Sequence, residues 1–162
     1  MLGGGPYDIV LGPRSRATDP RATGYNERNF FAEVSALLEV RYLSDSNGEV
    51  EWPVKGILWG PASRPLICLP MRGRWRDKAV NVFFLVTTGA PRTEVSASVF
   101  TALGCEVIPA AATVDLGGVS GTKVQLCDQD ISVLGTDFLS RNSCTLKVDY
   151  SEQTVTLQKH KV

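Results

Sequence analysis

The chain has 162 residues, of which 43% are apolar, and this is enough to bury the core of one domain. Its 17 lysines and arginines balance its 17 aspartates and glutamates, so no overall electrostatic field attracts it to nucleic acid or to an anionic membrane. No apolar run approaches the roughly 20 residues of a membrane-spanning helix, and we expect neither membrane insertion nor a nucleic-acid partner.

The first segment, residues 1–34, is predicted to be an irregular N-terminal extension. A glycine run with a proline at 3–6 and a polar stretch at 13–21, broken by prolines, lack the pattern of a core element. Acidic residues interrupt what would otherwise resemble an organelle-targeting peptide. A tail that packs along a neighbouring protein, anchored by Phe30 and Phe31, explains the composition equally well.

Residues 35–60 are predicted to form an additional β hairpin. Apolar and charged residues alternate towards position 43, a polar turn with a glycine follows at 44–48, and an extended run returns at 50–59. The two tryptophans of this second run give the hairpin a heavy apolar face, which we expect to pack on the domain itself.

The next hairpin is predicted from two apolar runs, 64–71 and 78–86, joined by residues 72–77. The connection places three arginines around Trp75, a combination that can bind phosphates and stack on bases. We favour a solvated turn, because these charges are local and the whole chain is neutral.

A tight polar loop follows this hairpin, and we expect the functional site there. The apolar run 82–86 ends abruptly in Thr87, Thr88, Gly89 and Ala90, which is typical of a buried strand leading into a turn. Behind the loop, apolar residues repeat at helical spacing, so a short helix is predicted within 93–104.

The last third of the chain is the clearest β sequence. Residues 131–139 read as an apolar strand, a Leu-Gly step and a short helix carrying Phe-Leu. Alternating apolar residues at 145–150 and 154–157, separated by a polar turn, predict a terminal hairpin.

Four widely spaced cysteines and one histidine near the C-terminus provide no spacing typical of a metal site, and we expect no cofactor. Isolated thiols on apolar strands are usually buried small hydrophobic groups, which indicates a reducing, intracellular compartment. The cytoplasm and an organelle such as the mitochondrion both remain open. The histidine, His160, lies in a charged tail, which argues against Ser-His-Asp or Cys-His catalysis.

Residues 82–90 and 131–139 resemble, in this order, the two signatures of retropepsin-like aspartic proteases. In that family an apolar strand runs into Asp-Thr-Gly-Ala, and a second apolar strand is followed by a Gly-containing helix. The resemblance implies an all-β fold, a closed acid-protease-like β barrel with one or two short helices, over residues 61–160. The extra hairpin of 35–60 and the tail of 1–34 would precede this barrel.

Glycines between the two signatures stand where the family places its flap. The flap-like loop would comprise Gly117, Gly118, Val119, Ser120 and Gly121. The nine residues that follow before the second signature are fewer than the family has there. Either part of the cleft wall is missing or the flap is not formed by these residues.

The resemblance also suggests a structural ion pair. In the family an arginine of the short helix binds the active-site loop, whereas Thr136 stands at that position here. We expect the charges to be exchanged, with Arg92 on the loop pairing with Asp137 on the helix.

The residue at the catalytic position decides the expected function. Aspartic proteases need two carboxylates that share one proton, and Thr87 offers only a neutral hydroxyl at this place. The sequence therefore predicts a catalytically inactive domain that serves as a structural or protein-binding accessory subunit of a larger assembly. An aspartic endopeptidase, as an active form or an active-site variant, and a peptide-binding module are the alternatives.

The expected partners are other protein subunits. In the resembled family the chain ends provide strands that pair between two copies of the domain. A homodimer and a pair with a similar lobe are therefore both open.

Overall fold

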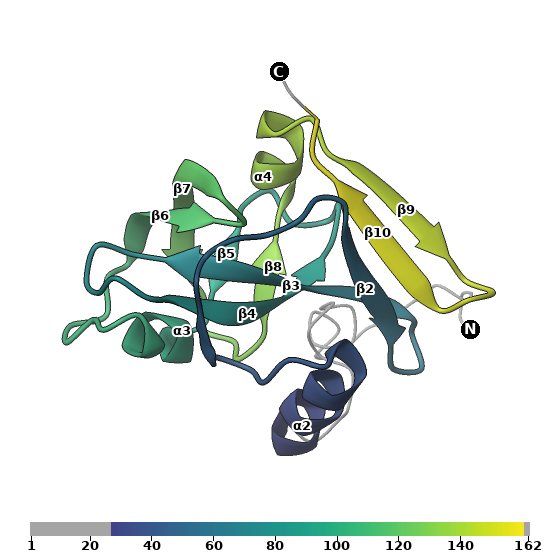
Figure 1. Cartoon of the computed structure of the whole chain (residues 1–162), viewed down its shortest axis with the longest axis horizontal. Coiled ribbons are helices and arrows are strands. Elements are labelled where there is room, and N and C mark those ends of the chain that lie inside the picture. Colours follow the sequence, from purple (N-terminus) through teal and green to yellow (C-terminus); the bar gives the residue numbers. More distant parts are fainter. Residues whose placement is uncertain (1–26, 161–162) are drawn as a thin grey trace, which may run out of the picture.

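The computed structural model describes residues 27–160, which form three helices and ten strands. The helices are α2 (Glu27–Leu38), α3 (Ala97–Ala102) and α4 (Thr136–Arg141). The strands are β1 (Asp45–Ser46), β2 (Val54–Trp59), β3 (Arg64–Arg72), β4 (Ala79–Val86), β5 (Glu94–Val95), β6 (Ala111–Leu116), β7 (Val119–Leu126), β8 (Ser132–Leu134), β9 (Thr145–Asp149) and β10 (Thr154–Gln158). The predicted all-β class is confirmed (Figure 1).

All ten strands belong to one sheet, in the order β1-β4-β8-β5-β7-β6-β3-β2-β10-β9. An additional pairing of β4 with β3 closes the segment from β4 to β3 into a barrel, as the sequence predicted. Most neighbours are antiparallel, but β4 runs parallel to β8 and β5 runs parallel to β7. Closure gives every strand of the barrel a neighbour on both sides over at least part of its length, which reduces the free strand edges.

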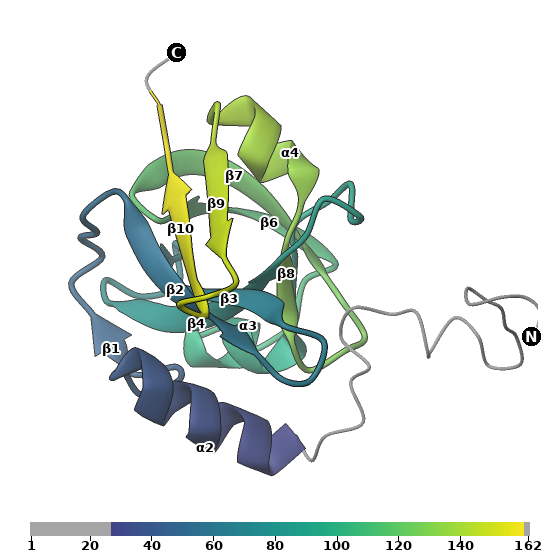
Figure 2. The ribbon, with the colours of Figure 1, turned by 90° about the vertical axis from the view of Figure 1, so that its right-hand side faces the viewer.

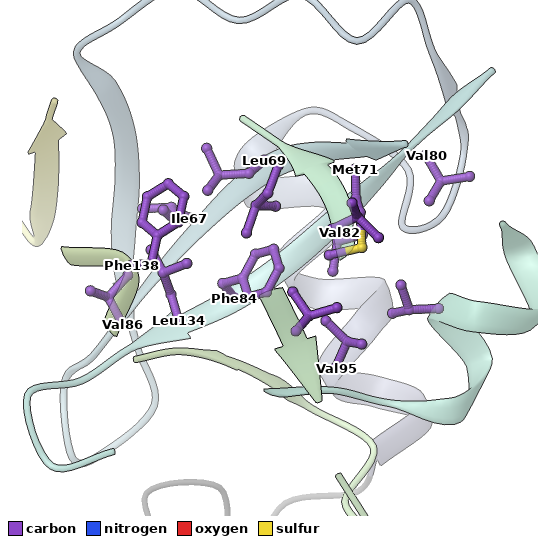
Figure 3. Packing of buried hydrophobic residues seen from close by; sticks show 14 of the residues in the cluster. Ile67, Leu69, Met71, Val80, Val82, Phe84, Val86, Val95, Leu134 and Phe138 are labelled. Atoms are coloured by element: carbon purple, nitrogen blue, oxygen red, sulfur yellow. The ribbon is translucent and has the colours of Figure 1, made fainter. Parts of the chain in front are cut away.

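The barrel interior is filled by alternate residues of β3 and β4. Successive side chains of a strand point to opposite faces, so one set from each strand enters the core. Figure 3 shows these side chains meeting Phe138 of α4. The set comprises Ile67, Leu69 and Met71 from β3 and Val80, Val82, Phe84 and Val86 from β4.

A second apolar cluster lies on the outer face of the same strands. Its buried members are Phe30, Val34, Trp59, Leu66, Phe83, Leu85, Ile131 and Val133. Helix α2 covers this face and lies along one side of the barrel in Figures 1 and 2. Strand β4 is therefore buried on both faces, which explains the continuous apolar run of its residues 82–86.

Helix α2 replaces part of the predicted irregular extension, whose residues 1–26 lie outside the described residues. Phe30, Val34 and Leu38 recur at intervals of four residues, so they share one helix face and reach the outer cluster together. Phe30 is 1% exposed, so it anchors the segment to its own barrel instead of a neighbouring protein.

The predicted hairpin of residues 35–60 is not formed. Strand β1 pairs with β4, whereas β2 pairs with β3 and β10. The short turn at Gly60–Ser63, closed by a hydrogen bond from Ser63 N to Gly60 O (3.0 Å), lets β2 pair directly with β3. A two-residue β1 offers too few backbone groups to compete with that long strand.

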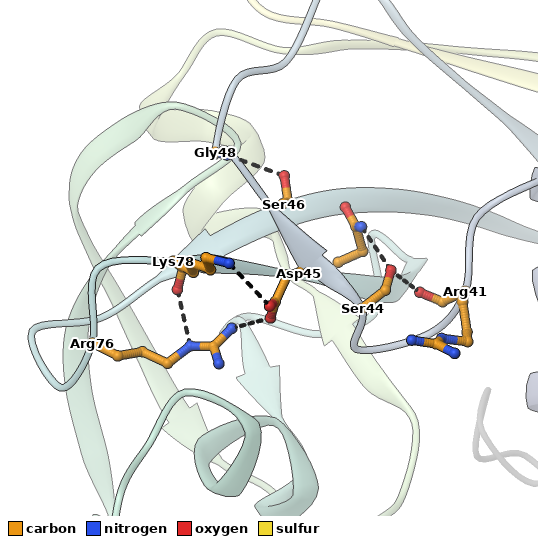
Figure 4. A network of polar contacts seen from close by, with 8 residues as sticks. Arg41, Ser44, Asp45, Ser46, Gly48, Arg76 and Lys78 are labelled. Atoms are coloured by element: carbon orange, nitrogen blue, oxygen red, sulfur yellow. Dashed lines mark hydrogen bonds and ion pairs between the residues drawn. The ribbon is translucent and has the colours of Figure 1, made fainter.

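The arginine-rich connection between β3 and β4 has structural contacts. Arg76 binds the carboxylate of Asp45, which Lys78 also approaches (Figure 4). Trp75 packs edge-on against Phe100 at 6.1 Å between ring centroids. Arg76 and Trp75 therefore contact residues of the same domain, as expected for a structural turn.

Candidate functional site

The loop that follows β4 is a compact turn held by its own hydroxyl group. Gly89 N donates to Thr87 Oγ1 (3.0 Å), and Thr87 N donates to Leu134 O across the parallel β4–β8 pair (3.4 Å). Thr87 is half-buried, while Thr88 and Gly89 are exposed. The hydroxyl at the predicted catalytic position thus accepts a hydrogen bond from its own loop.

The second sequence motif docks against this loop. Thr136 N donates to Ala90 O (2.8 Å), and a Cβ at Gly135 would lie only 2.4 Å from Arg92 O and 2.9 Å from Ala90 O. A side chain at position 135 would therefore force the two segments apart. The structure brings residues 87–92 and 134–137 together, as the order of the motifs suggested.

Asp137 connects the helix to the loop, but through Thr93. Its Oδ2 accepts from Thr93 N (3.0 Å), and its Oδ1 accepts from Thr93 Oγ1 (2.7 Å) and from Phe138 N (2.7 Å). Thr93 is buried, and its hydroxyl also accepts from Gly135 N (3.1 Å).

The expected ion pair between Arg92 and Asp137 is absent from the contacts of residues 27–160. Two backbone N–H groups and one hydroxyl occupy both carboxylate oxygens, while the Arg92 side chain lies exposed to solvent. Asp137 therefore binds the neutral donor Thr93 where the sequence predicted an ion pair with Arg92.

The Thr87 side chain has no carboxylate partner among the described residues. Thr87 Oγ1 has Gly89 N as its hydrogen-bond partner, and no Asp or Glu of residues 27–160 binds it. Asp115 stands opposite Arg72, where β6 meets the far end of β3.

The flap-like loop lies at the opposite end of β4 from Thr87. Gly117 and Gly118, with φ of 58° and 80°, form the tight turn between β6 and β7. Gly117 N donates to Pro70 O (2.8 Å), and Pro70 pairs with Asn81. Thr87 lies six positions after Asn81, or about 20 Å along a strand.

The assignment of residues 117–121 as a flap is therefore corrected. Val119, Ser120 and Gly121 continue into β7, and Trp52 Nε1 donates to Gly117 O (3.2 Å), which fixes the turn to the domain. Paired glycines indicate a hairpin turn in a sequence, but they do not show which end of the barrel it covers.

Helix α2 fills the apolar surface beside the loop, a feature that the sequence analysis missed. Ala90 packs against the same outer cluster as Phe30 and Val34. Tyr42 stacks on Phe31 at 4.1 Å between centroids and lies over the same cluster. Burial raises the pKa of the Tyr42 phenol. The four-residue apolar spacing in α2 is the signal from which this cover was predictable.

Cys68, Cys105 and Cys144 form no disulfide bond, and the contacts of the cysteines are those of largely buried groups. Cys105 and Cys127 are buried, and Cys127 Sγ donates to Gln129 O (3.3 Å). Burial raises the pKa of Cys68 to about 12 and also raises that of Cys144. Within residues 27–160 no three His, Cys, Asp or Glu side chains are grouped to hold a metal ion, and no helix there is long and apolar enough to cross a bilayer.

Comparison with known proteins gives structural neighbours only. No protein-family model matches the chain, and no curated protein matches it. The structure is similar to that of a retropepsin-like aspartic protease from Rickettsia conorii, with 19% identity, a TM-score of 0.47, and coverage of 70% of this chain and 99% of that one.

Two further solved structures are similar. EIAV protease in complex with the inhibitor HBY-793 is 18% identical, with a TM-score of 0.39 and coverage of 56% of this chain and 98% of that one. The retroviral protease-like domain of Ddi1 from Leishmania major is 14% identical, with a TM-score of 0.36 and coverage of 64% and 95%. At identities of 14–19% these structures indicate the fold alone, so the chemistry of the loop at Thr87 has to be argued from the residues of this chain.

Proposed function

We propose that this chain is a catalytically inactive retropepsin-like domain that serves as a structural or protein-binding subunit of a larger assembly. The observation that carries the proposal is the neutral, hydrogen-bonded hydroxyl of Thr87. The sequence resemblance aligns Thr87 with the catalytic Asp of the family, and the Thr87 hydroxyl accepts a hydrogen bond from Gly89 N within the loop.

The chemistry of threonine supports this proposal. An aspartic protease uses one ionised carboxylate to activate water and one protonated carboxylate to bond the substrate carbonyl. A threonine hydroxyl is neutral near neutral pH and cannot perform the first role. Loss of a principal catalytic group typically lowers the rate by several orders of magnitude.

The cover provided by α2 supports the proposal independently of Thr87. Phe30 and Val34 belong to the buried outer cluster against which Ala90 of the loop packs. An extended peptide could approach the loop on this side only after displacing buried aromatic side chains. This arrangement disfavours both an endopeptidase and a module that binds peptides beside the loop.

The same contacts explain why the loop persists without catalysis. Thr136 N, Gly135 and Thr93 bind the loop to α4, so these small residues stabilise the barrel whatever stands at position 87. The free thiols of Cys68, Cys105 and Cys144 are compatible with the reducing, intracellular compartment that forms part of the proposal. No nucleic-acid partner is proposed, because the net charge is zero.

A cleavage assay tests the proposal. The purified chain is incubated with a diverse peptide library from about pH 3 to pH 8, beside Thr87→Val and the control Thr88→Val, whose side chain is exposed. We expect no cleavage by any of the three proteins. Cleavage by the native chain that Thr87→Val abolishes and Thr88→Val retains would establish the endopeptidase alternative.

A further inference from the structure

A cavity lies beside the first residue of β4, at the end of this strand opposite to Thr87. Its volume is about 160 Å³, which is comparable to an engineered protein cavity of about 150 Å³ that holds a benzene molecule. The cavity is therefore large enough for a small organic ligand. Its lining residues are Gly48, Pro70, Arg72, Ala79, Asp115 and Gly118.

The two charged residues of this cavity are neighbours in the sheet. Arg72, at the end of β3, stands directly opposite Asp115 of β6. Side chains of directly opposite residues project from the same face of a sheet, and opposite charges in this relation normally attract each other. Among the described residues, 27–160, Arg72 and Asp115 nevertheless form no ion pair with each other.

The position of the Arg72 side chain explains why the pair is not formed. Arg72 Nη2 donates to the backbone oxygen of Asn47 (2.8 Å), in the segment that follows β1. Gly48 permits this contact, because a Cβ at position 48 would overlap Arg72 Nη2. The guanidinium is thus held by the backbone at Asn47, while the carboxylate of Asp115 lines the same cavity without touching it.

The segment that holds Arg72 is itself fixed by local hydrogen bonds. Gly48 N donates to Ser46 Oγ (3.0 Å), as Figure 4 shows, and Glu49 N donates to Asn47 Oδ1 (2.9 Å). Ser46 also pairs with Ala79 where β1 meets β4. This wall of the cavity is therefore formed before a ligand binds, which lowers the entropic cost of binding.

Both charged groups of the cavity have unused bonding capacity. Arg72 Nε is buried and donates to no acceptor of residues 27–160. The Asp115 carboxylate has no hydrogen-bond or ion-pair partner within the same residues. A buried donor without an acceptor destabilises a protein, so a ligand that supplies an acceptor is favoured. A guanidinium is suited to bind a carboxylate, and a carboxylate is suited to accept from an ammonium group.

We propose that this cavity binds a free α-amino acid with a small side chain, with its carboxylate on Arg72 and its ammonium group on Asp115. One carbon atom separates the two charged groups of an α-amino acid, which suits two side chains that are neighbours on one face of a sheet. The volume of the cavity restricts the ligand to about the size of alanine, which has as many non-hydrogen atoms as benzene. The proposal depends neither on Thr87 nor on the inactive-domain proposal.

A titration of the native chain with L-alanine, followed by NMR of the isotope-labelled protein, tests this site. We expect saturable shifts of the amides of Gly48 and Gly118, which line the cavity. Propionate and ethylammonium are matched probes of similar size that carry only one of the two charges. Each should bind at least tenfold more weakly than L-alanine, because one of the two charged side chains is left without a partner.

Variants of the two charged residues test their roles. Asp115→Asn keeps the shape of the side chain and removes its charge, and it should weaken L-alanine binding at least tenfold. Arg72→Met should do the same, although it also removes the bond to Asn47, so Asp115→Asn is the decisive variant. The matched controls Asp128→Asn and Arg141→Met, at exposed positions outside the cavity, should bind like the native chain.

Three results would overturn the proposal. One is the lack of any saturable shift at Gly48 and Gly118 with L-alanine at tens of millimolar. Another is propionate binding as tightly as L-alanine, which would assign the cavity to simple anions. The third is an Asp115→Asn protein that binds L-alanine as tightly as Asp128→Asn does.

Discussion

Thr93 and Asp137 are joined by two hydrogen bonds, from Thr93 N to Oδ2 (3.0 Å) and from Thr93 Oγ1 to Oδ1 (2.7 Å). The pair connects the end of the loop at Thr87 to the first turn of α4. Thr93 Oγ1 also accepts from Gly135 N (3.1 Å), so one buried hydroxyl bonds both parts of the second motif. The loop is thereby held by structural contacts that need no catalytic group.

Removal of the Asp137 carboxylate should therefore destabilise the domain. Asp137→Ala leaves the N–H and hydroxyl of buried Thr93 without acceptors, which we expect to cost about 1–3 kcal/mol in the free energy of unfolding. Urea unfolding measures this change. Asp77→Ala, the same substitution at an exposed residue of the β3–β4 connection, should change stability by less than about 0.5 kcal/mol. Equal losses in the two variants would contradict the structural role of Asp137.

The close approach of the loop to α4 makes position 135 intolerant of a side chain. Gly135→Ala would place Cβ 2.4 Å from the backbone oxygen of Arg92, and the expected loss is about 2–4 kcal/mol because backbone must move. Gly89→Ala, in the loop itself, meets only Thr87 Oγ1 at 3.4 Å and should be tolerated. Thermal unfolding compares the two. A Gly135→Ala protein as stable as Gly89→Ala would show that the segments are not in contact.

Helix α2 should contribute strongly to stability through its inner face. Phe30 is 1% exposed and contacts Trp59 edge-on at 4.9 Å between centroids, so Phe30→Ala should cost about 3–5 kcal/mol. Leu37 of the same helix is 58% exposed, and Leu37→Ala should change stability by less than about 0.5 kcal/mol. Denaturant unfolding distinguishes them. A small loss for Phe30→Ala would mean that α2 does not cover the barrel in solution.

Alkaline pH should destabilise the fold through Cys68. The pKa of this thiol is raised by burial to about 12 from an ordinary value of 9.0, so the folded state retains a proton that the unfolded state releases first. Its contribution is fully present below pH 9 and is lost as the pH rises towards 12, at up to about 1.4 kcal/mol per pH unit. The slope of unfolding free energy against pH should be smaller in Cys68→Ala. An unchanged slope would assign the alkaline loss to other groups.

Much of the barrel was predictable from local pattern. The alternation in β9 and β10 and the apolar runs of β3 and β4 identify strands. The two motifs at Thr87 and Gly135 were expected near each other, and their backbones are in contact. Gly117 lies in a turn with positive φ, although its glycines were expected to form part of a flap.

What the sequence did not predict depends on contacts between distant segments. The role of Phe30 becomes visible only when the outer face of β4 is known to need a cover. Asp137 binds Thr93 because the N–H and hydroxyl of Thr93 lie within hydrogen-bond distance of its carboxylate. This geometry could not be inferred from the opposite charges of Arg92 and Asp137. The glycines at 117–118 mark a turn, but its distance from Thr87 follows from the pairing of β3, β4 and β6.

The native mass of the protein, isolated under mild conditions from its source with all co-purifying chains identified, tests the central claim most directly. If the chain is an inactive subunit, it should be recovered in a large assembly at fixed stoichiometry with other proteins. This assembly should persist when the salt concentration is raised. Recovery of a free monomer or a free homodimer, with no other protein bound and with peptide-cleaving activity, would contradict it.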